Sequence, residues 1–358
     1  MNSTTRRRLK MLALPLAAVL VLGACSTDES DSGDAEDTGS GDAATGEVNV
    51  TGSSTVAPIS TRVAELWADS GAEVTVNVDG PGTGDGFQQF CAGEADISDA
   101  SRPIDEEEIA LCEENGVEFI ELKVAFDGIS VLTNPANEGV ECLSFADMYA
   151  LVGPESQGFS TWADAQELAT ELGSDTELPD APLDITAPGE ESGTYDSFVE
   201  LVIESAGEAR VEEGVLTEDE VAMTRPDYQS SSDDNIIIQG IEGSDSSFGW
   251  VGFAFAEEAG DGVKELAVSA EPGGECVAPT TETIADGSYP ISRPLFIYVS
   301  ASAAEDNSAV AEYVDYYLSD DGIVAVSEVG YVELPADELE TTRTTWADRT
   351  TGTTEGDA

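Results

Sequence analysis

The sequence predicts an α/β fold with two lobes, and three observations carry this prediction. The chain has 358 residues, which is more than a single compact core usually needs. Stretches with strand and helix periodicity alternate between residues 48 and 122, an order that favours a parallel sheet with helices on both faces. Two long apolar stretches, residues 124–133 and 295–300, have the composition of strands that link two lobes.

The elements of the first lobe can be read in chain order. Its first two strands show alternating valines, and its first helix has apolar side chains three or four positions apart. Gly116 is the expected end of the third helix. The expected elements are a strand at 48–50, a helix at 56–67, a strand at 74–78, helices at 87–91 and 105–114, and a strand at 117–122.

The linking strands also set the expected domain boundaries. If the chain leaves the first lobe near residue 128 and returns near 290, the first lobe comprises 47–129 with 288–340, and the second comprises 130–287. Residues 341–358 are polar and rich in threonine, which predicts a loosely ordered C-terminal tail.

Residues 1–24 are expected to be a signal peptide. Basic residues precede an apolar run at 11–22 that is too short to span a membrane as a mature helix. The run ends in Leu22-Gly23-Ala24-Cys25, which resembles the lipobox of bacterial lipoproteins. That resemblance implies cleavage before Cys25, lipidation of its sulfur with acyl chains such as palmitate, and anchoring to the cell membrane. An ordinary secreted protein is the alternative. Cys25 and the small, acidic residues up to 46 would form a flexible tether.

Four further cysteines remain: Cys91, Cys112, Cys142 and Cys276. An even number in an exported chain favours two disulfides, and four cysteines allow three pairings. We expect Cys91–Cys112 with Cys142–Cys276, which closes one short and one long loop. A zinc site is the rival, but the sequence has no CxxC and no histidine, so we expect no metal and no cofactor.

The charge of the chain is strongly negative. Its 13 basic and 74 acidic residues give a formal net charge of −61. Nucleic acids and anionic membrane surfaces are poor partners for such a protein, so any membrane contact is expected through the lipid alone. The simplest interpretation is a solvated acidic surface that keeps the protein soluble.

Three turns rich in glycine and hydroxyl residues lie at or near expected helix starts, at residues 52–59, 80–87 and 188–195. The first N–H groups of a helix have no internal partner, and the helix dipole favours an anion there. Structural capping explains any one such turn. Three in one chain predict an anion pocket, and none of them matches a Walker loop.

A fourth segment, residues 96–104, contains Arg102 directly after Ser101. A guanidinium group matches an oxyanion with two parallel hydrogen bonds. The alternative is a surface arginine paired with one of the many carboxylates.

These segments together resemble the phosphate-binding proteins of ABC importers. The matching stretches are GSSTVAPI, GPGTGDGFQQFCAGEADISDASRPI, PGEESGTYDSF, DDNIIIQGIEGSDSSFGWVGFAFAEE and SYPISRPLFIYV, between about residues 50 and 300. The resemblance implies a type II periplasmic-binding-protein fold, in which two α/β lobes joined by two crossing strands close on the anion. It also implies a monomeric, extracytoplasmic protein that captures inorganic phosphate and delivers it to the membrane subunits of an importer.

The turns and the resemblance together predict the ligand-binding residues: Ser54 and Gly84 come from the turns, and the resemblance implies Thr55, Thr83, Ser101, Arg102, Ser192, Gly193 and Thr194. Two positions depart from the family pattern. Many members carry an aspartate where this chain has Ser101, and an arginine within the stretch that reads Pro188-Gly189-Glu190-Glu191 here. We therefore expect Arg102 to replace the arginine. A nearby acid, Glu191, Asp196 or Asp85, is expected to accept the proton of hydrogen phosphate.

Other functions remain as alternatives. An enzyme is disfavoured because a serine nucleophile would lack a histidine base, no G-x-S-x-G elbow occurs, and no spacing singles out a carboxylate pair. No catalytic residue is therefore expected. The remaining alternatives are a binder of another oxyanion, such as sulfate or molybdate, and a surface-anchored phosphate sensor or adhesion protein.

Overall fold

The computed structural model describes residues 46–190 and 192–354. The expected signal peptide, Cys25, nearly all of the tether and Glu191 lie outside the described residues. The architecture below belongs to the compact unit Ala43–Ala358. No helix in the described part of the chain is long and apolar enough to span a bilayer.

The first lobe is built on parallel strands β1 (Glu47–Gly52), β2 (Thr75–Val78) and β3 (Ile97–Ala100), in the order β2-β1-β3. Alternating valines of β1 and the buried face of α1 meet in one core, because Val48, Val50, Ile59 and Val63 are all fully or almost fully buried. Its helices are α1 (Ala57–Asp69), α2 (Thr83–Cys91), α3 (Glu106–Asn115), α12 (Ala301–Asp306), α13 (Ser308–Tyr317), α14 (Ala325–Glu328) and α15 (Ala336–Ala347).

The second lobe is built on β8 (Ser247–Gly252), β6 (Asp184–Ala187) and β7 (Gln229–Ser230), with a separate pair, β5 (Cys142–Ser144) and β10 (Ala267–Ser269). Its α-helices are α4 (Phe145–Val152), α5 (Gln166–Glu171), α6 (Gly193–Phe198), α7 (Ser205–Glu212), α8 (Glu218–Val221), α9 (Asp234–Glu242), α10 (Phe253–Ala259) and α11 (Thr281–Ala285). The shorter elements are η1 (Pro154–Ser156), η2 (Trp162–Ala165), η3 (Val199–Glu204), η4 (Gly260–Gly262), β9 (Lys264–Glu265) and β12 (Val332–Glu333).

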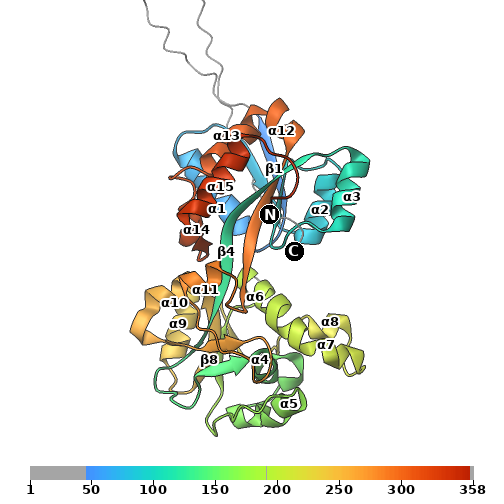
Figure 1. Cartoon of the computed structure of the whole chain (residues 1–358). Helices are drawn as coiled ribbons and strands as arrows, with labels where there is room; N and C mark the ends of the chain where they lie inside the picture. The colour runs from blue at the N-terminus through green and yellow to red at the C-terminus, as the bar shows by residue number, and fades with distance from the viewer. Residues whose placement is uncertain (1–45, 191, 355–358) are drawn as a thin grey trace, which may run out of the picture. The chain divides into compact units, whose positions relative to one another are not determined.

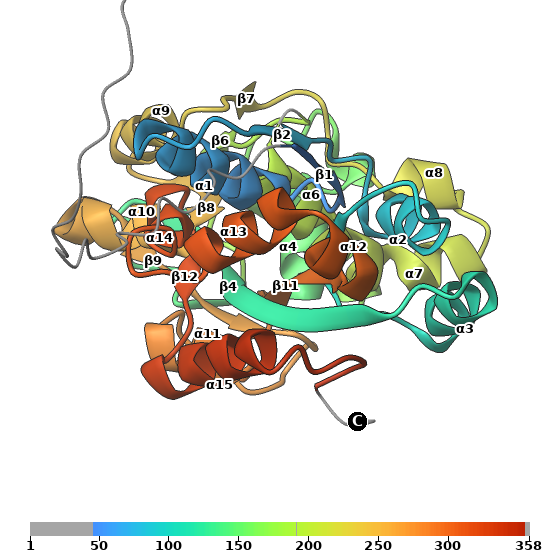
Figure 2. The same cartoon turned by 90° about the horizontal axis from the view of Figure 1, so that it is seen from above.

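Two strands cross between the lobes, as Figure 1 shows, and Figure 2 gives the view of the same strands from above. Residues 119–128 of strand β4 (Phe119–Thr133) pair antiparallel with the whole of β11 (Ser292–Ser300). Leu122 and Val124 of β4 belong to the core of the first lobe, whereas Ile129 and Val131 belong to the core of the second. The expected architecture of two α/β lobes joined by two crossing strands is therefore confirmed. The boundaries expected at residues 129 and 287 stay a prediction.

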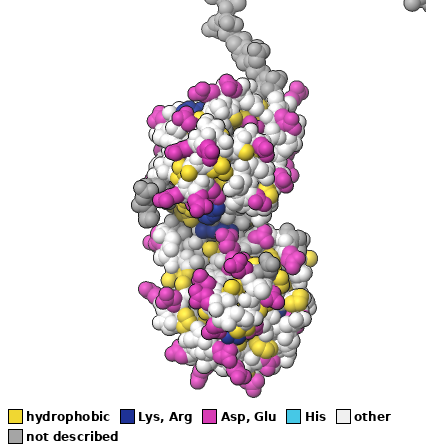
Figure 3. All heavy atoms as spheres, turned by 90° about the vertical axis from the view of Figure 1, so that its right-hand side faces the viewer, with side chains coloured by type: hydrophobic (Ala, Val, Ile, Leu, Met, Phe, Trp, Pro, Cys, Tyr) yellow, Lys and Arg dark blue, Asp and Glu magenta, His cyan; other side chains and the backbone are white. Residues whose placement is uncertain are grey.

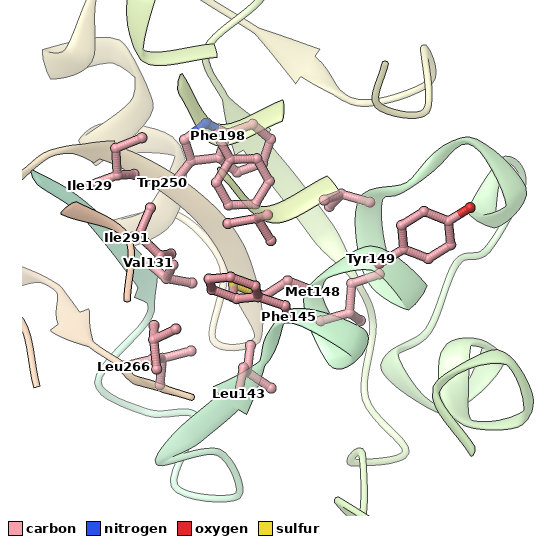
Figure 4. Packing of buried hydrophobic residues seen from close by; sticks show 14 of the residues in the cluster. Ile129, Val131, Leu143, Phe145, Met148, Tyr149, Phe198, Trp250, Leu266 and Ile291 are labelled. Atoms are coloured by element: carbon pink, nitrogen blue, oxygen red, sulfur yellow. The ribbon is translucent and has the colours of Figure 1, made fainter. Parts of the chain in front are cut away.

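The core of the second lobe fixes the helix that begins at Gly193. Figure 4 shows Phe198, which follows that start, packed against Trp250 of β8 and near Ile129 of β4. The Phe198 and Trp250 rings are stacked, with centroids 4.0 Å apart. Because Phe198 and Trp250 are fully buried, the orientation of α6 is set by packing rather than by its polar face.

Both expected disulfides are present in the structure. Cys91–Cys112 joins α2 to α3, and Cys142–Cys276 joins β5 to the segment after β10. The described residues contain no cluster of acidic or cysteine side chains that could hold a metal ion.

The expected loose tail from residue 341 onward is wrong for the described residues. Helix α15 runs to Ala347, and Gly352 forms a bridge to Ile120 of β4. The physical reason is that Thr342 and Trp346 lie on one helical face and are buried there. The Thr342 hydroxyl donates to the Lys123 carbonyl, and the Trp346 indole donates to Asp315 at 2.6 Å. Residues 355–358 lie outside the described part.

Candidate functional site

The end of β1 brings three of the four predicted segments into backbone contact. Gly52 has φ of 126°, and a Cβ built on it would lie 2.1 Å from the carbonyl oxygen of Asp99. A Cβ on Gly86 would lie 2.3 Å from the Cα of Gly52. Only glycine permits these approaches, so residues 52–59, 80–87 and 96–104 converge because of their glycines.

The third segment meets the first through Gly193. A Cβ on Gly193 would lie 3.2 Å from the Ser54 carbonyl oxygen and 3.3 Å from the Cα of Thr55. The Ser54 hydroxyl donates to Asp196 at 2.8 Å, and the hydroxyls of Thr55 and Ser197 are 3.2 Å apart. Hydroxyls of the first lobe therefore reach the first turn of α6 in the second lobe.

Some predicted ligand hydroxyls also have structural partners. Ser192 is the N-cap of α6, and its hydroxyl accepts from the backbone N–H of Thr194. The hydroxyls of Thr83 and Ser101 are 3.0 Å apart, and the Ser101 N–H donates to Thr83 at 3.2 Å. These contacts hold the second and fourth segments together, and Ser101 is buried where they meet.

Arg102 lies beside the predicted site but is bound to its own segment. Its two terminal nitrogens donate to the two carboxylate oxygens of Glu108, both at 2.8 Å. Glu108 also closes the capping box of α3 with Asp105. The hydrogen bonds to Glu108 raise the pKa of Arg102, against the effect of partial burial. Its side chain stays 37% exposed and lies near Gly84, where a built Cβ would be 3.9 Å from Nη2.

The buried cation at the junction of the lobes is Arg293, to which the sequence analysis assigned no role. Arg293 lies on β11, and its side chain is 9% exposed. Its Nη2 donates to Ser197 at 2.8 Å and to Thr55 at 3.3 Å, and its Nη1 donates to Glu200 at 2.6 Å. One guanidinium therefore contacts the first turn of the first lobe and the α6 region of the second.

Three acidic side chains surround this cation. The Asp127 carboxylate lies 3.5 Å from Nε of Arg293. Burial raises the pKa of Asp127 and that of Asp196, although Arg293 opposes the shift in both cases. Burial lowers the pKa of Arg293, but the nearby charges of Asp127 and Glu200 outweigh it and leave that pKa raised. The site thus joins a permanent cation to carboxyl groups that hold a proton more readily than usual.

The assembled site has the chemistry of an oxyanion receptor. It combines serine and threonine hydroxyls, helix-start N–H groups, one buried arginine and one partly exposed arginine. Figure 3 shows acidic side chains scattered over one face of the protein and basic side chains gathered near its middle. Of the acids expected to take the phosphate proton, Asp196 lies in the site through its bond to Ser54. Glu191 lies outside the described residues, and Asp85 is exposed in the first turn of α2.

The sequence contains a signal that could have pointed to Arg293. The chain has only 13 basic residues, and Arg293 stands at the start of an apolar strand within the quoted stretch SYPISRPLFIYV. A charged residue at such a position is usually paired when buried. Its partner could not be found from the sequence because Asp127 faces it only through the β4–β11 register.

Comparisons with known proteins agree with this chemistry. Residues 37–321 match the model of a family described as a PBP superfamily domain. The chain is 37% identical over 290 residues to a protein named SphX from Synechocystis sp., covering 80% of this chain and 78% of that protein. It is 33% identical over 320 residues to the phosphate-binding protein PstS of Staphylococcus epidermidis, covering 89% of this chain and 87% of that protein.

A solved structure is similar along most of the chain. It is the crystal structure of a possible phosphate-binding protein from Planctomyces limnophilus, with 35% sequence identity and a TM-score of 0.74. The match covers 86% of this chain and 99% of that one.

Proposed function

The chain belongs to the PBP superfamily, within its family of phosphate-binding proteins, and on this premise we propose that it captures inorganic phosphate outside the cytoplasm and delivers it to an ABC importer. Its fold is the type II fold that the sequence resemblance implied. The observation that supports the proposal is that the first segment contacts the other three: Gly52 lies against Asp99 and Gly86, and Thr55 contacts Gly193 and also Arg293.

The site offers enough donors for tight binding. Hydrogen bonds to charged groups contribute about 1.5–3 kcal/mol each, and micromolar affinity requires about 8 kcal/mol. Four or five such contacts therefore suffice. The proposed donors are the residues named from the sequence, with Arg293 added: Ser54, Thr55, Thr83, Gly84, Ser101, Arg102, Ser192, Gly193, Thr194 and Arg293.

Discrimination against sulfate needs a group that accepts a proton from the ligand. Hydrogen phosphate can donate one hydrogen bond at neutral pH, whereas sulfate has no proton to give. Asp196 is the proposed acceptor, because its carboxylate is 2.8 Å from the Ser54 hydroxyl, next to Thr55. A fully ionised sulfate would face that carboxylate without a hydrogen bond and would be repelled.

The remaining features fit a lipid-anchored receptor. Cys25 is proposed to carry the lipid, and the acidic residues after it to hold the lobes away from the membrane by roughly 25 Å. Membrane subunits of the importer are the proposed partner, and the receptor is proposed to act as a monomer without enzymatic activity.

Calorimetric titration tests the function directly. The purified soluble domain should release heat with phosphate and arsenate and little with sulfate or molybdate. Thr55→Val is expected to weaken phosphate binding, while Thr341→Val, an exposed threonine on α15, should not change it. Clear binding of sulfate or molybdate without phosphate binding would reassign the ligand. Phosphate binding without importer-dependent uptake in cells would favour a sensor.

A further inference from the structure

Glu200 occupies one terminal nitrogen of the buried Arg293 guanidinium. It lies on η3 (Val199–Glu204), and its Oε2 accepts from Nη1 of Arg293 at 2.6 Å. The two side chains differ in accessibility, because Glu200 is 52% exposed and Arg293 only 9%. A solvent-facing carboxylate therefore holds a position on Arg293 that an oxyanion would also prefer.

The other partners of Arg293 are fixed in the protein interior. Nη2 donates to Ser197 and Thr55, and Nε lies near Asp127. Thr55, Ser197 and Asp127 are all at most 2% exposed. Among the described partners of Arg293, Glu200 alone reaches solvent, so it is the partner that can leave without disrupting the core.

The charges around Arg293 oppose the arrival of an anion as long as the Glu200 carboxylate stays in place. One guanidinium faces two carboxylates, Asp127 and Glu200. Burial is the main cause of the raised pKa of Asp196, and the hydrogen bond to Glu108 is the main cause of the raised pKa of Arg102; the charge of Glu200 adds to both shifts. A phosphate at Nη1 would lie against the Glu200 carboxylate in a partly desolvated place, where like charges repel strongly.

The local helix geometry keeps Glu200 in this position. Ser197 and Glu200 are three residues apart and both contact Arg293, so they lie on the same helical face. Residues 199–204 form a π-helical turn between α6 and α7, a feature that is common at functional sites. Phe198 anchors the preceding turn through its stack on Trp250, so we expect Glu200 to leave by rotation of its own side chain.

We propose that Glu200 is an internal competitor of the ligand: its carboxylate must leave Nη1 of Arg293 before phosphate binds there. Glu200 then sets the affinity of the site below the value that its donors alone would give. This inference rests on the proposed phosphate-binding function and adds a residue that determines affinity.

The test compares Glu200→Gln and Glu200→Ala with the wild-type protein by calorimetric titration of inorganic phosphate. Both variants are expected to bind phosphate about tenfold more tightly, because phosphate no longer displaces a charged hydrogen bond. Glu204→Gln is the matched control. Glu204 lies one turn further along the same helix, and its pKa is raised by burial and by Glu200, but it has no ion pair with Arg293 among the described residues. We expect its affinity to stay within about twofold of the wild-type value.

The outcomes separate the inference from the function on which it rests. Failure of the wild-type protein to bind phosphate would overturn the proposed function. If the wild-type protein binds phosphate and both Glu200 variants bind it equally or more weakly, Glu200 does not compete with phosphate. It is then only a structural partner of Arg293. Equal tightening in Glu204→Gln would assign the effect to general charge instead. Glu200→Gln retains a carbonyl acceptor for Arg293, so it keeps the test valid if Glu200→Ala unfolds.

Discussion

Arg293 of β11 and Asp127 of β4 face one another across the two strands that cross between the lobes. They are partners in the β4–β11 register, and Nε of Arg293 lies 3.5 Å from Oδ2 of Asp127. Both are buried, with 8% and 2% of their surface exposed. The same guanidinium binds Thr55 and Ser197, so one buried ion pair supports both the crossing strands and the proposed site.

Removing one partner of this pair is expected to destabilise the protein strongly. Arg293→Gln leaves the Asp127 carboxyl without its cation, and Asp127→Asn leaves Arg293 with Glu200 as its acidic partner. Leaving a buried charge unpaired costs about 3–5 kcal/mol, so Arg293→Gln is expected to lose about this much, and Asp127→Asn less because Arg293 keeps Glu200. Urea unfolding followed by circular dichroism measures the free energy of unfolding of each variant.

The double variant supplies the control. Arg293→Gln with Asp127→Asn should recover part of the loss, because neither side chain is then a buried unpaired charge. If the loss of unfolding free energy in the double variant equals the sum of the two single losses, the two residues are not coupled. Phosphate binding should be lost in the double variant even where stability recovers.

The sequence could single out the segments that meet at the end of β1 because the signals for them are local. Glycines beside hydroxyl residues at helix starts are visible in the sequence, and Gly52, Gly86 and Gly193 are the positions where the segments touch. Helix α15 was missed because threonines suggested a polar tail, while only its contacts with Lys123 and Asp315 show which face is buried.

Arg293 and Arg102 show why the buried cation between the lobes could not be identified from the sequence. Arg102 stands in a matched segment, yet its strongest contact is Glu108, six residues later. Arg293 gains its role from strand register and from Ser197, 96 residues away. Long-range pairing of this kind leaves no periodicity in the sequence.

Arg102→Ala is expected to weaken phosphate binding about tenfold, and less than Arg293→Ala does. The Arg102 guanidinium is partly exposed and already paired with Glu108. Solvent therefore screens its attraction for a bound anion. Arg343→Ala is the matched control, because Arg343 is 32% exposed against 37% for Arg102 and also pairs with one aspartate. Calorimetry should show that Arg343→Ala binds phosphate with the wild-type affinity. An equal loss of affinity in both variants would show that Arg102 does not contact the phosphate.

Stability is expected to fall as the pH rises from about 4 to about 8, in part because of Asp99. Burial raises the pKa of Asp99 to about 8, against the hydrogen bond from Ser60. In this window the folded protein holds a proton that the unfolded chain has lost, so each increase in pH favours unfolding until the folded-state pKa is passed.

Asp99→Asn tests this contribution, because its amide does not titrate. The melting temperature of the variant should fall less between pH 5 and pH 8.5 than that of the wild-type protein. Parallel pH profiles for the two proteins would show that Asp99 does not hold a proton in the folded state.

Cys25→Ser is expected to release the protein from the membrane fraction. Stable anchoring needs more than one acyl chain, and the proposed lipid on Cys25 supplies them. Cell fractionation with immunoblotting measures the distribution, and Ser26→Ala, at the neighbouring position, is the control. A Cys25→Ser variant that still sediments with membranes would contradict the lipid anchor.

Phosphate association is expected to become faster as salt rises from very low values. The chain has a formal net charge of −61, so a phosphate dianion is repelled at long range. The Debye length falls from about 30 Å at 0.01 M to about 8 Å at 0.15 M, which screens the distant carboxylates. Stopped-flow measurement of tryptophan fluorescence gives the association rate constant at both concentrations.

The dissociation rate constant should change little over the same range, and this separates a buried site from a basic patch. The donors around Arg293 act at hydrogen-bond distances in a desolvated place, where salt screens weakly. Affinity should therefore stay constant or rise with salt. An exposed cluster of basic residues would behave in the opposite way, because salt would weaken its attraction for the anion. A steep loss of affinity between 0.01 M and 0.15 M would place the phosphate at the exposed Arg102 side chain rather than at Arg293 and the hydroxyls packed around it.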